Sequence, residues 1–166
     1  GASLPLAVLE QFEQVFGIPV YEGYGLTETS PVATFNQKDW PTKPGTVGRP
    51  IWGVDAEIAR PEIEERIELL PIGELGEIVI RGHNIMKGYL NRPEATAEAI
   101  VDGWFRTGDL GTKDEDGYIT IVDRKKDMVL RGGFNVYPRE VEEVLMRHPD
   151  VAQVSVIAVP HPTHGE

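Results

Sequence analysis

A tyrosine flanked by glycines, with hydroxyl and carboxylate side chains close behind it, is the segment best equipped for chemistry. It reads Gly23-Tyr24-Gly25-Leu26-Thr27-Glu28-Thr29. The glycines let the backbone come close to a flat ligand, and the Tyr24 ring offers a stacking face. Thr27 supplies a hydroxyl for a phosphate oxygen, and Glu28 supplies an anionic ligand for a hard cation such as magnesium. A nucleotide with its magnesium ion needs these groups, but a packed tyrosine in a polar loop explains the same residues equally well.

Three further segments carry suitable groups, and each has an ordinary structural alternative. Asp109 directly follows Gly108, so it is placed either to accept hydrogen bonds from a ribose diol or to form an Asx-type turn. The charged run 123–127 is either a solvated loop or a boundary where an arginine reaches a nucleotide and a lysine forms a hinge. Two glycines followed by aromatic residues in 131–138 suit either a narrow ligand channel or a plain strand–turn–helix connection.

The elements that must position these groups change in kind along the chain. Residues 3–16 predict an amphipathic helix, and residues 19–22 predict a strand leading into the tyrosine loop, an order typical of a parallel α/β layer edge. Residues 31–50 are rich in proline and glycine and predict a surface linker. Short elements follow, namely strands at 54–59, 77–81 and 118–122, an acidic excursion at 62–70 and a short helix at 94–101.

After residue 122 the pattern becomes that of a small α+β domain. A short strand is expected at 127–131, and a helix is expected to begin at Pro138 and to precede a β-rich run at 151–159. The charge changes as well, because residues 1–122 are strongly acidic and the remainder is close to neutral. The expected fold class is therefore α/β plus a β-barrel-like subdomain, followed by the start of a small α+β C-terminal domain.

Composition limits the classes of function. The chain has 166 residues, 40% of them hydrophobic, a formal net charge of −11 and no cysteine. The acidic balance argues against nucleic acid as a main partner, because phosphate backbones select basic faces. The lack of cysteine excludes disulfides and thiolate chemistry and fits a reducing cytoplasm. No apolar run is long enough to predict a membrane span.

Taken together and in this order, the four segments resemble those of the adenylate-forming enzymes, which comprise acyl-CoA synthetases, luciferases and the adenylation domains of peptide synthetases. The resemblance continues through 73–78 and 86–96 and covers almost the whole chain. The amino-acid sequence of segments 123–128 and 133–138 is most similar to that of bacterial long- or medium-chain fatty acyl-CoA ligases. Aryl or amino acid adenylating enzymes of the same superfamily stay open as alternatives, as does a non-enzymatic truncated module.

The resemblance implies a site for ATP and magnesium. Tyr24 would stack on the adenine, Thr27 would bind a phosphate oxygen, and Glu28 would bind the magnesium ion. Asp109 would hold the ribose hydroxyls, helped by Arg124. The other nucleotide contacts would be small residues that border the adenine or leave room for the acyl-adenylate, namely Gly1, Ala2, Gly23 and Gly25.

The resemblance also implies a second step that uses CoA. Lys126 matches the hinge about which the C-terminal domain turns, and the pantetheine tunnel would be lined by Gly132, Gly133 and Phe134. The implied parent enzyme is a cytoplasmic fatty acid–CoA ligase that uses a small-molecule carboxylate, ATP and CoA. Peripheral contact with a membrane and the oligomeric state stay open.

The chain is expected to be a piece of such an enzyme, truncated at both ends. The superfamily's Ser/Thr/Gly-rich phosphate loop lies upstream of the matched region, its principal catalytic lysine lies downstream, and no lysine follows Lys126. The 166-residue chain alone is therefore expected to be inactive. The expected parts are the end of the large α/β domain at 1–35, a distorted β-barrel at 36–122, the hinge at 123–127 and the start of the C-terminal domain at 128–166.

Overall fold

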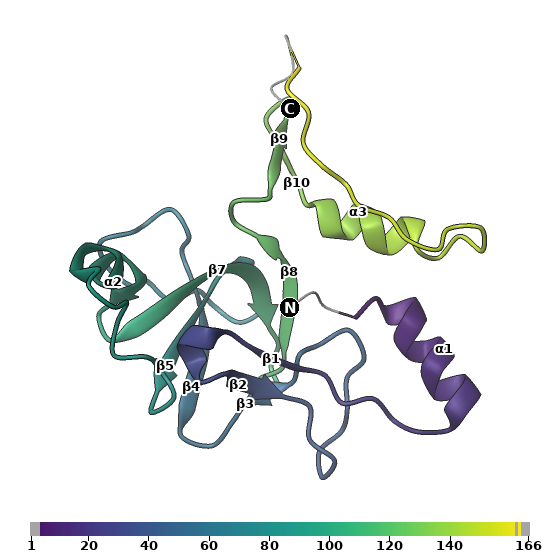
Figure 1. Ribbon diagram of the computed structural model, residues 1–166, viewed down its shortest axis with the longest axis horizontal. Helices are drawn as coiled ribbons and strands as arrows, with labels where there is room; N and C mark the ends of the chain where they lie inside the picture. The colour runs from purple at the N-terminus through teal and green to yellow at the C-terminus, as the bar shows by residue number, and fades with distance from the viewer. Residues whose placement is uncertain (1–3, 162, 164–166) are drawn as a thin grey trace. The chain divides into compact units, whose positions relative to one another are not determined.

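Strand pairing organises most of this chain, as the computed structural model shows for the residues that it describes, 4–161 and 163. The chain divides into two units (Figure 1). The sheet unit spans Tyr21–Ile121, and the split unit is formed by the segments Gly1–Val20 and Val122–Glu166. Tyr24 and Asp109 belong to the sheet unit, whereas Arg124 and Lys126 belong to the split unit.

The larger sheet is the core of the sheet unit. Its strands are β4 (Val54–Ala59), β5 (Gly76–Gly82), β6 (Ile100–Val101), β7 (Trp104–Lys113) and β8 (Ile119–Arg124), of which residues 122–124 already belong to the split unit. They are ordered β4-β5-β7-β6, with β8 paired to β7. Isoleucines from three strands belong to one buried hydrophobic cluster, namely Ile58, Ile80 and Ile119. β-Branched side chains such as these pack well on a pleated surface. The strands expected at 54–59, 77–81 and 118–122 are confirmed, whereas β7 was not predicted.

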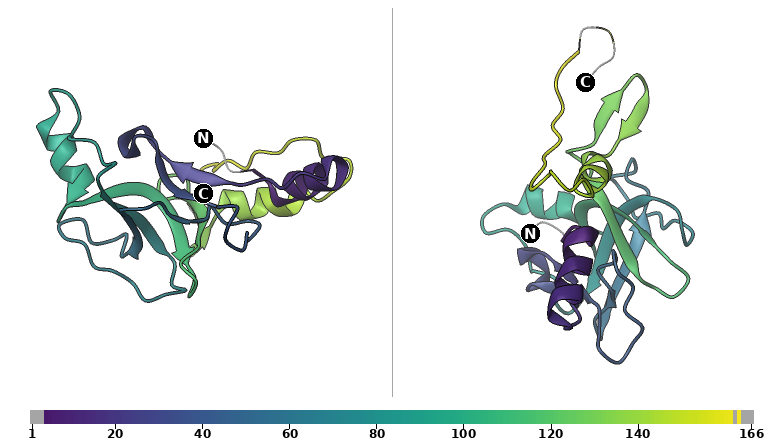
Figure 2. Two further views of the ribbon diagram at one scale, coloured as in Figure 1. Left: turned by 90° about the horizontal axis from the view of Figure 1, so that it is seen from below. Right: turned by 90° about the vertical axis from the view of Figure 1, so that its right-hand side faces the viewer.

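Two of the expected connections differ from those found. The helix expected at 94–101 is α2 (Pro93–Ala99), and the chain then passes directly into β6. The acidic excursion at 62–70 returns to β4 through a bridge between Ala59 and Leu69. The result is a mixed α/β fold with a curled sheet, as the two views of Figure 2 show. This agrees with the fold class expected from the sequence.

A smaller antiparallel sheet carries the tyrosine loop. It consists of β1 (Gly23–Gly25), β2 (Val32–Phe35) and β3 (Arg49–Pro50) in that order. The prediction of a strand at 19–22 is wrong. The Val20 N–H donates a hydrogen bond of 2.7 Å to the Glu13 carboxylate, and the sheet pairing begins only at Gly23. The linker predicted at 31–50 is wrong in part, since both β2 and β3 lie within it. The pairing of β1 with β2 is antiparallel and does not form a parallel edge.

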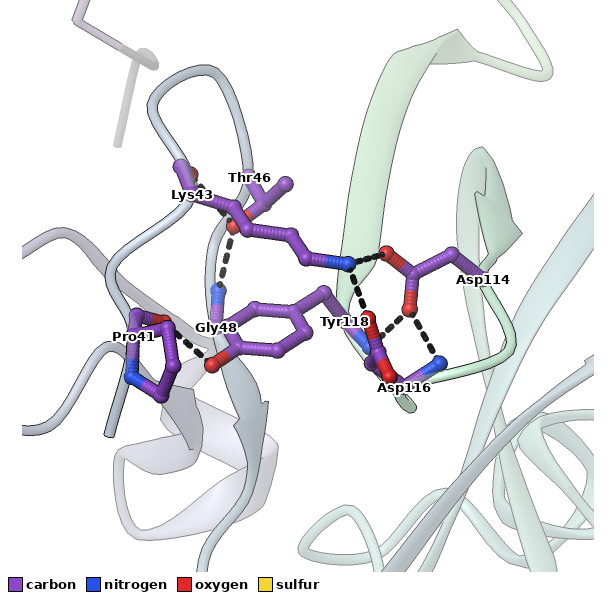
Figure 3. A network of polar contacts seen from close by, with 7 residues as sticks. All are labelled: Pro41, Lys43, Thr46, Gly48, Asp114, Asp116 and Tyr118. Atoms are coloured by element: carbon purple, nitrogen blue, oxygen red, sulfur yellow. Dashed lines mark hydrogen bonds and ion pairs between the residues drawn. The ribbon is translucent and has the colours of Figure 1, made fainter.

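The loop between β2 and β3 is tied to the hairpin between β7 and β8 by a polar network (Figure 3). The Lys43 ammonium lies 2.5 Å from Asp114 Oδ2 and 2.7 Å from Asp116 Oδ2. The Tyr118 hydroxyl donates a hydrogen bond to the Pro41 carbonyl. Partial burial alone would raise the pKa of Asp114, but its hydrogen bonds with Lys43 and with backbone N–H groups outweigh burial and lower it. This network holds a proline- and glycine-rich loop in one place.

The split unit contains α1 (Leu6–Phe16), the hairpin of β9 (Val129–Arg131) and β10 (Phe134–Val136), and α3 (Pro138–Leu145). The helix expected at 3–16 is confirmed over Leu6–Phe16 and ends at Gly17, whose φ is 64°. The helix start at Pro138 is also confirmed. The expected strand at 127–131 is shortened to β9. The β-rich run predicted at 151–159 is wrong, because that segment pairs with no strand in the described part of the chain.

Candidate functional site

Tyr24 and Asp109 meet in the sheet unit although 85 positions separate them in sequence. The Tyr24 hydroxyl donates a hydrogen bond of 2.5 Å to Asp109 Oδ2. Tyr24 stands on β1 and Asp109 on β7, so the contact joins the two sheets. The Asp109 residue is only 6% exposed. A charged acceptor that receives a hydrogen bond in a largely buried position is held in a defined orientation.

The glycine after Tyr24 is required by a close approach of backbone to backbone. A Cβ placed on Gly25 would lie 1.7 Å from the Pro31 carbonyl oxygen. The side chain of Thr29 is buried beneath this loop, and its hydroxyl accepts a hydrogen bond of 2.8 Å from the Leu26 N–H. The tight loop that follows Tyr24 therefore requires glycine at position 25, because its own backbone packs there. The sequence alone did not reveal this reason for the glycine.

Thr27 and Glu28 lie on the short 3₁₀ turn η1 (Thr27–Thr29) that follows β1. Thr27 is exposed and Glu28 is partly buried. The Tyr89 hydroxyl donates a hydrogen bond of 2.9 Å to Glu28 Oε1, and the Glu28 carbonyl accepts one of 2.8 Å from the Met86 N–H. Burial raises the pKa of Tyr89, and its hydrogen bond to the Glu28 carboxylate raises it further. The segment around Tyr89 thus holds both the backbone and the side chain of Glu28.

Sequence reasoning did not single out Tyr89. It lies in the segment 86–96 that contributed to the resemblance, but no local spacing connects it to Glu28. Two further ties order this segment, because Thr96 Oγ1 accepts a hydrogen bond of 2.9 Å from the Tyr89 N–H and donates one of 2.8 Å to the Arg92 carbonyl. Tyr89 therefore reaches Glu28 from a braced loop.

The donor set around Glu28 suits a magnesium ion that arrives with its substrate. No cluster of three or more His, Cys, Asp or Glu side chains able to hold a metal ion occurs among the described residues. Magnesium is usually bound by one or two carboxylates together with substrate phosphates and water. One carboxylate beside the exposed hydroxyl of Thr27 fits that pattern, and it does not fit a metal site built from protein ligands alone.

Gly23 begins β1 in the sheet unit, where a Cβ would lie 2.4 Å from the Phe35 ring. The other expected site residues lie in the split unit or outside the described residues. Arg124 ends β8 and is exposed, and Lys126 is exposed in a turn closed by a hydrogen bond of 3.0 Å from the Asp127 N–H to the Arg124 carbonyl. Gly132 and Gly133 turn the β9–β10 hairpin with φ values of 57° and 87°, which glycine adopts without strain. Phe134 directly after them is 76% exposed. The expected adenine contacts Gly1 and Ala2 lie outside the described residues.

The Asp123 carboxylate links this exposed turn to the helix that follows the hairpin. Its Oδ2 accepts a hydrogen bond of 3.1 Å from the Arg139 N–H in the first turn of α3. Its Oδ1 accepts one of 2.7 Å from the Arg124 N–H. Carboxylates favour the N-terminal end of a helix, where N–H groups lack intrahelical partners.

None of the described helices has the length and the apolar character needed to cross a bilayer. Residues 1–90 match the family of AMP-binding enzymes, and residues 140–166 match the AMP-binding enzyme C-terminal domain. The long-chain-fatty-acid–CoA ligase of Bacillus subtilis (strain 168) is 47% identical over 99% of this chain and 29% of its own length. The chain thus spans less than a third of that relative.

Solved structures agree with these matches. ATP-bound MatB from Rhodopseudomonas palustris superposes with a TM-score of 0.93 at 42% identity, over 99% of this chain and 32% of that one. The o-succinylbenzoate CoA synthetase of Bacillus subtilis in complex with ATP and magnesium ion superposes with a TM-score of 0.84 at 35% identity, over 99% and 34%. On this evidence the chain belongs to the AMP-binding enzyme family, the adenylate-forming superfamily that its motifs resemble.

Proposed function

We propose that the longer protein containing this chain is an ATP-dependent fatty acid–CoA ligase. A fatty carboxylate attacks the α-phosphorus of ATP and releases pyrophosphate, and the thiol of CoA then attacks the acyl carbonyl and releases AMP. The observation that carries the proposal is the contact between Tyr24 and Asp109 beside the turn of Thr27 and Glu28. The name and 47% identity of the Bacillus subtilis relative support the CoA ligase class and the fatty substrate.

Four residues of the sheet unit would bind the nucleotide. The Tyr24 phenol is fixed at its hydroxyl by Asp109, so its ring is held for stacking on adenine. The buried Asp109 carboxylate would accept hydrogen bonds from the ribose hydroxyls. Thr27 would donate to a phosphate oxygen, and Glu28 would bind the magnesium ion. That ion would neutralise charge on the phosphates.

The split unit would serve the CoA step. Lys126 lies in an exposed turn, where a change of backbone conformation meets little packing resistance, and it would act as the hinge. Arg124 would assist at the ribose. The exposed Gly132, Gly133 and Phe134 would line the pantetheine tunnel. The expected domain division, with its hinge at 123–127, and a cytoplasmic location are parts of this proposal.

A panel of acids tests the substrate class. ATP–pyrophosphate exchange by the full-length protein is expected to be fastest with fatty acids and slower with aryl or amino acids. The o-succinylbenzoate CoA synthetase among the similar structures makes an aryl acid the specific competitor. Faster exchange with aryl acids contradicts the fatty assignment but keeps the ligase class. Absence of exchange with every acid would favour a module without enzymatic activity.

A charge-neutralising variant tests the magnesium role. Glu28→Gln is expected to lower exchange in the full-length protein and to raise the magnesium concentration needed for half-maximal rate. Glu115→Gln is the matched control, because Glu115 is an exposed residue of the turn between β7 and β8. Equal rates and equal magnesium dependence in the two variants contradict the assignment. The 166-residue chain alone is expected to form no acyl-CoA, because it has no lysine after Lys126.

A further inference from the structure

Strands β5 and β7 lose their regular register beside the candidate site. Ile78 of β5 alone opposes residues 107–109 of β7, whereas pairing is regular on either side, at Glu77–Leu110 and Val79–Arg106. Asp109 is the last residue of this bulge. Bulges re-aim side chains and leave backbone groups without ladder partners. The orientation of Asp109 therefore depends on whatever satisfies the bulged backbone.

Two side chains satisfy it. Glu77 Oε1 accepts a hydrogen bond of 3.0 Å from the Gly108 N–H, and Thr107 Oγ1 accepts one of 3.0 Å from the Asp109 N–H. The Thr107 hydroxyl also donates at 2.7 Å to the carbonyl of Ile78, the residue opposite the bulge. Gly108 has a φ of 73°, so the backbone between the two contacts takes a left-handed turn. We call the Glu77 carboxylate and the Thr107 hydroxyl the bulge clamp.

The clamp is itself firmly anchored. Arg106 donates two hydrogen bonds to Glu77 Oε2, of 2.6 Å from Nη2 and of 3.1 Å from Nε. The other carboxylate oxygen, Oε1, accepts the hydrogen bond from the Gly108 N–H. Arg106 Nη1 donates a further bond of 2.6 Å to the Ile63 carbonyl. The side chains of Arg106 and Glu77 are 8% and 4% exposed. A buried charge pair with its hydrogen bonds satisfied has little freedom to move.

We infer that the bulge clamp positions Asp109, with Glu77 and Thr107 acting as positioning residues that make the site discriminate ribose from deoxyribose. The inference rests on the proposed function, in which Asp109 holds the ribose hydroxyls. A carboxylate that accepts hydrogen bonds from sugar hydroxyls must be positioned to within a few tenths of an ångström for those bonds to keep good geometry. Tyr24 fixes the Asp109 side chain from one side, and the clamp fixes its backbone from the other.

The test uses a matched pair of variants at one position in the full-length protein. Thr107→Val keeps the shape of the side chain and removes the hydroxyl, whereas Thr107→Ser keeps the hydroxyl. The first readout is the ratio of kcat/KM for ATP to kcat/KM for 2′-deoxy-ATP and 3′-deoxy-ATP in pyrophosphate exchange. The second is amide hydrogen exchange, followed by mass spectrometry on the peptide that contains residues 104–113.

Thr107→Val is expected to lower the ATP preference about tenfold, since misplacing a group by 1 Å costs up to about 10²-fold. It is also expected to speed amide exchange in the 104–113 peptide. Thr107→Ser is expected to restore both towards wild type. Val54→Ala is the control for general destabilisation, because Val54 is buried on β4 and pairs with Gly82, at the end of β5 that is farther from the bulge. It is expected to leave the nucleotide preference unchanged.

Asp109→Asn separates failure of this inference from failure of the proposed function. If that variant keeps the full preference for ATP, the ribose role of Asp109 is wrong and the inference falls with it. If Asp109→Asn loses the preference but Thr107→Val keeps it, the clamp alone is overturned. A loss in Thr107→Val that is matched by Val54→Ala or by Thr107→Ser also overturns the clamp.

Discussion

Two ion pairs of nearly identical geometry, one buried and one exposed, allow the energetic role of burial to be measured in this chain. In the buried pair, Glu77 Oε2 accepts bonds of 3.1 Å and 2.6 Å from Nε and Nη2 of Arg106. In the exposed pair, Asp55 Oδ2 accepts bonds of 3.2 Å and 2.9 Å from the same two atoms of Arg81. The buried side chains are 4% and 8% exposed, and the others 56% and 53%.

We expect Glu77→Gln to destabilise the chain by about 3 kcal/mol or more, because it leaves the Arg106 charge buried without a counter-charge. Asp55→Asn is expected to cost less than about 1 kcal/mol, since water screens the Arg81 charge. With a urea m value of about 1.5 kcal/mol/M, the two variants should lower the unfolding midpoint by about 2 M and by less than about 0.7 M.

Urea unfolding of the 166-residue chain measures both midpoints when it is followed by circular dichroism and by tryptophan fluorescence, to which the buried Trp104 contributes. An unchanged m value is required for the comparison. A repeat in about 1 M salt should reduce the effect of Asp55→Asn and leave that of Glu77→Gln, because the Debye length falls to about 3 Å in water but buried pairs are screened little. Equal shifts for the two variants would refute the reasoning from burial.

Three further outcomes are expected. Gly25→Ala should lower the melting temperature severely or prevent folding, because its Cβ would lie 1.7 Å from a neighbouring carbonyl oxygen; a normal melting curve contradicts this. The pKa of Asp114 is lowered in the folded state, so its contribution to stability is present at neutral pH and is lost as the pH falls through that lowered pKa. Lys43→Met should flatten this acid-side loss in urea midpoints measured from about pH 7 to pH 3, and an unaltered pH profile would show that Lys43 is not its cause. Tyr89→Phe removes the hydroxyl that bonds Glu28; with Glu28 as the proposed magnesium ligand, loss of this supporting contact should weaken magnesium binding about 10–100-fold. Magnesium titration of pyrophosphate exchange in the full-length protein measures it, and an unchanged half-saturation point refutes the supporting role.

Periodic segments were predictable because their pattern is local. The apolar spacing of α1, the proline at the start of α3 and the β-branched run of β5 carry their structure within a few residues. The strands β1, β2 and β3 were missed or misplaced, since they are short and contain glycine or proline. Their backbone groups are satisfied only by partners elsewhere in the chain. The run at 151–159 shows the converse, because it has β propensity but no strand among the described residues pairs with it.

For the candidate site, residue types and their order determined the family and suggested Tyr24, Glu28 and Asp109. Tertiary structure alone decided that Tyr24 bonds Asp109, that Tyr89 reaches Glu28, and that a buried Glu77 supports the backbone next to Asp109. These contacts join residues that are distant in sequence, and no local spacing encodes them. A motif records which groups the chemistry needs, whereas the sheet register and one bulge determine where those groups point.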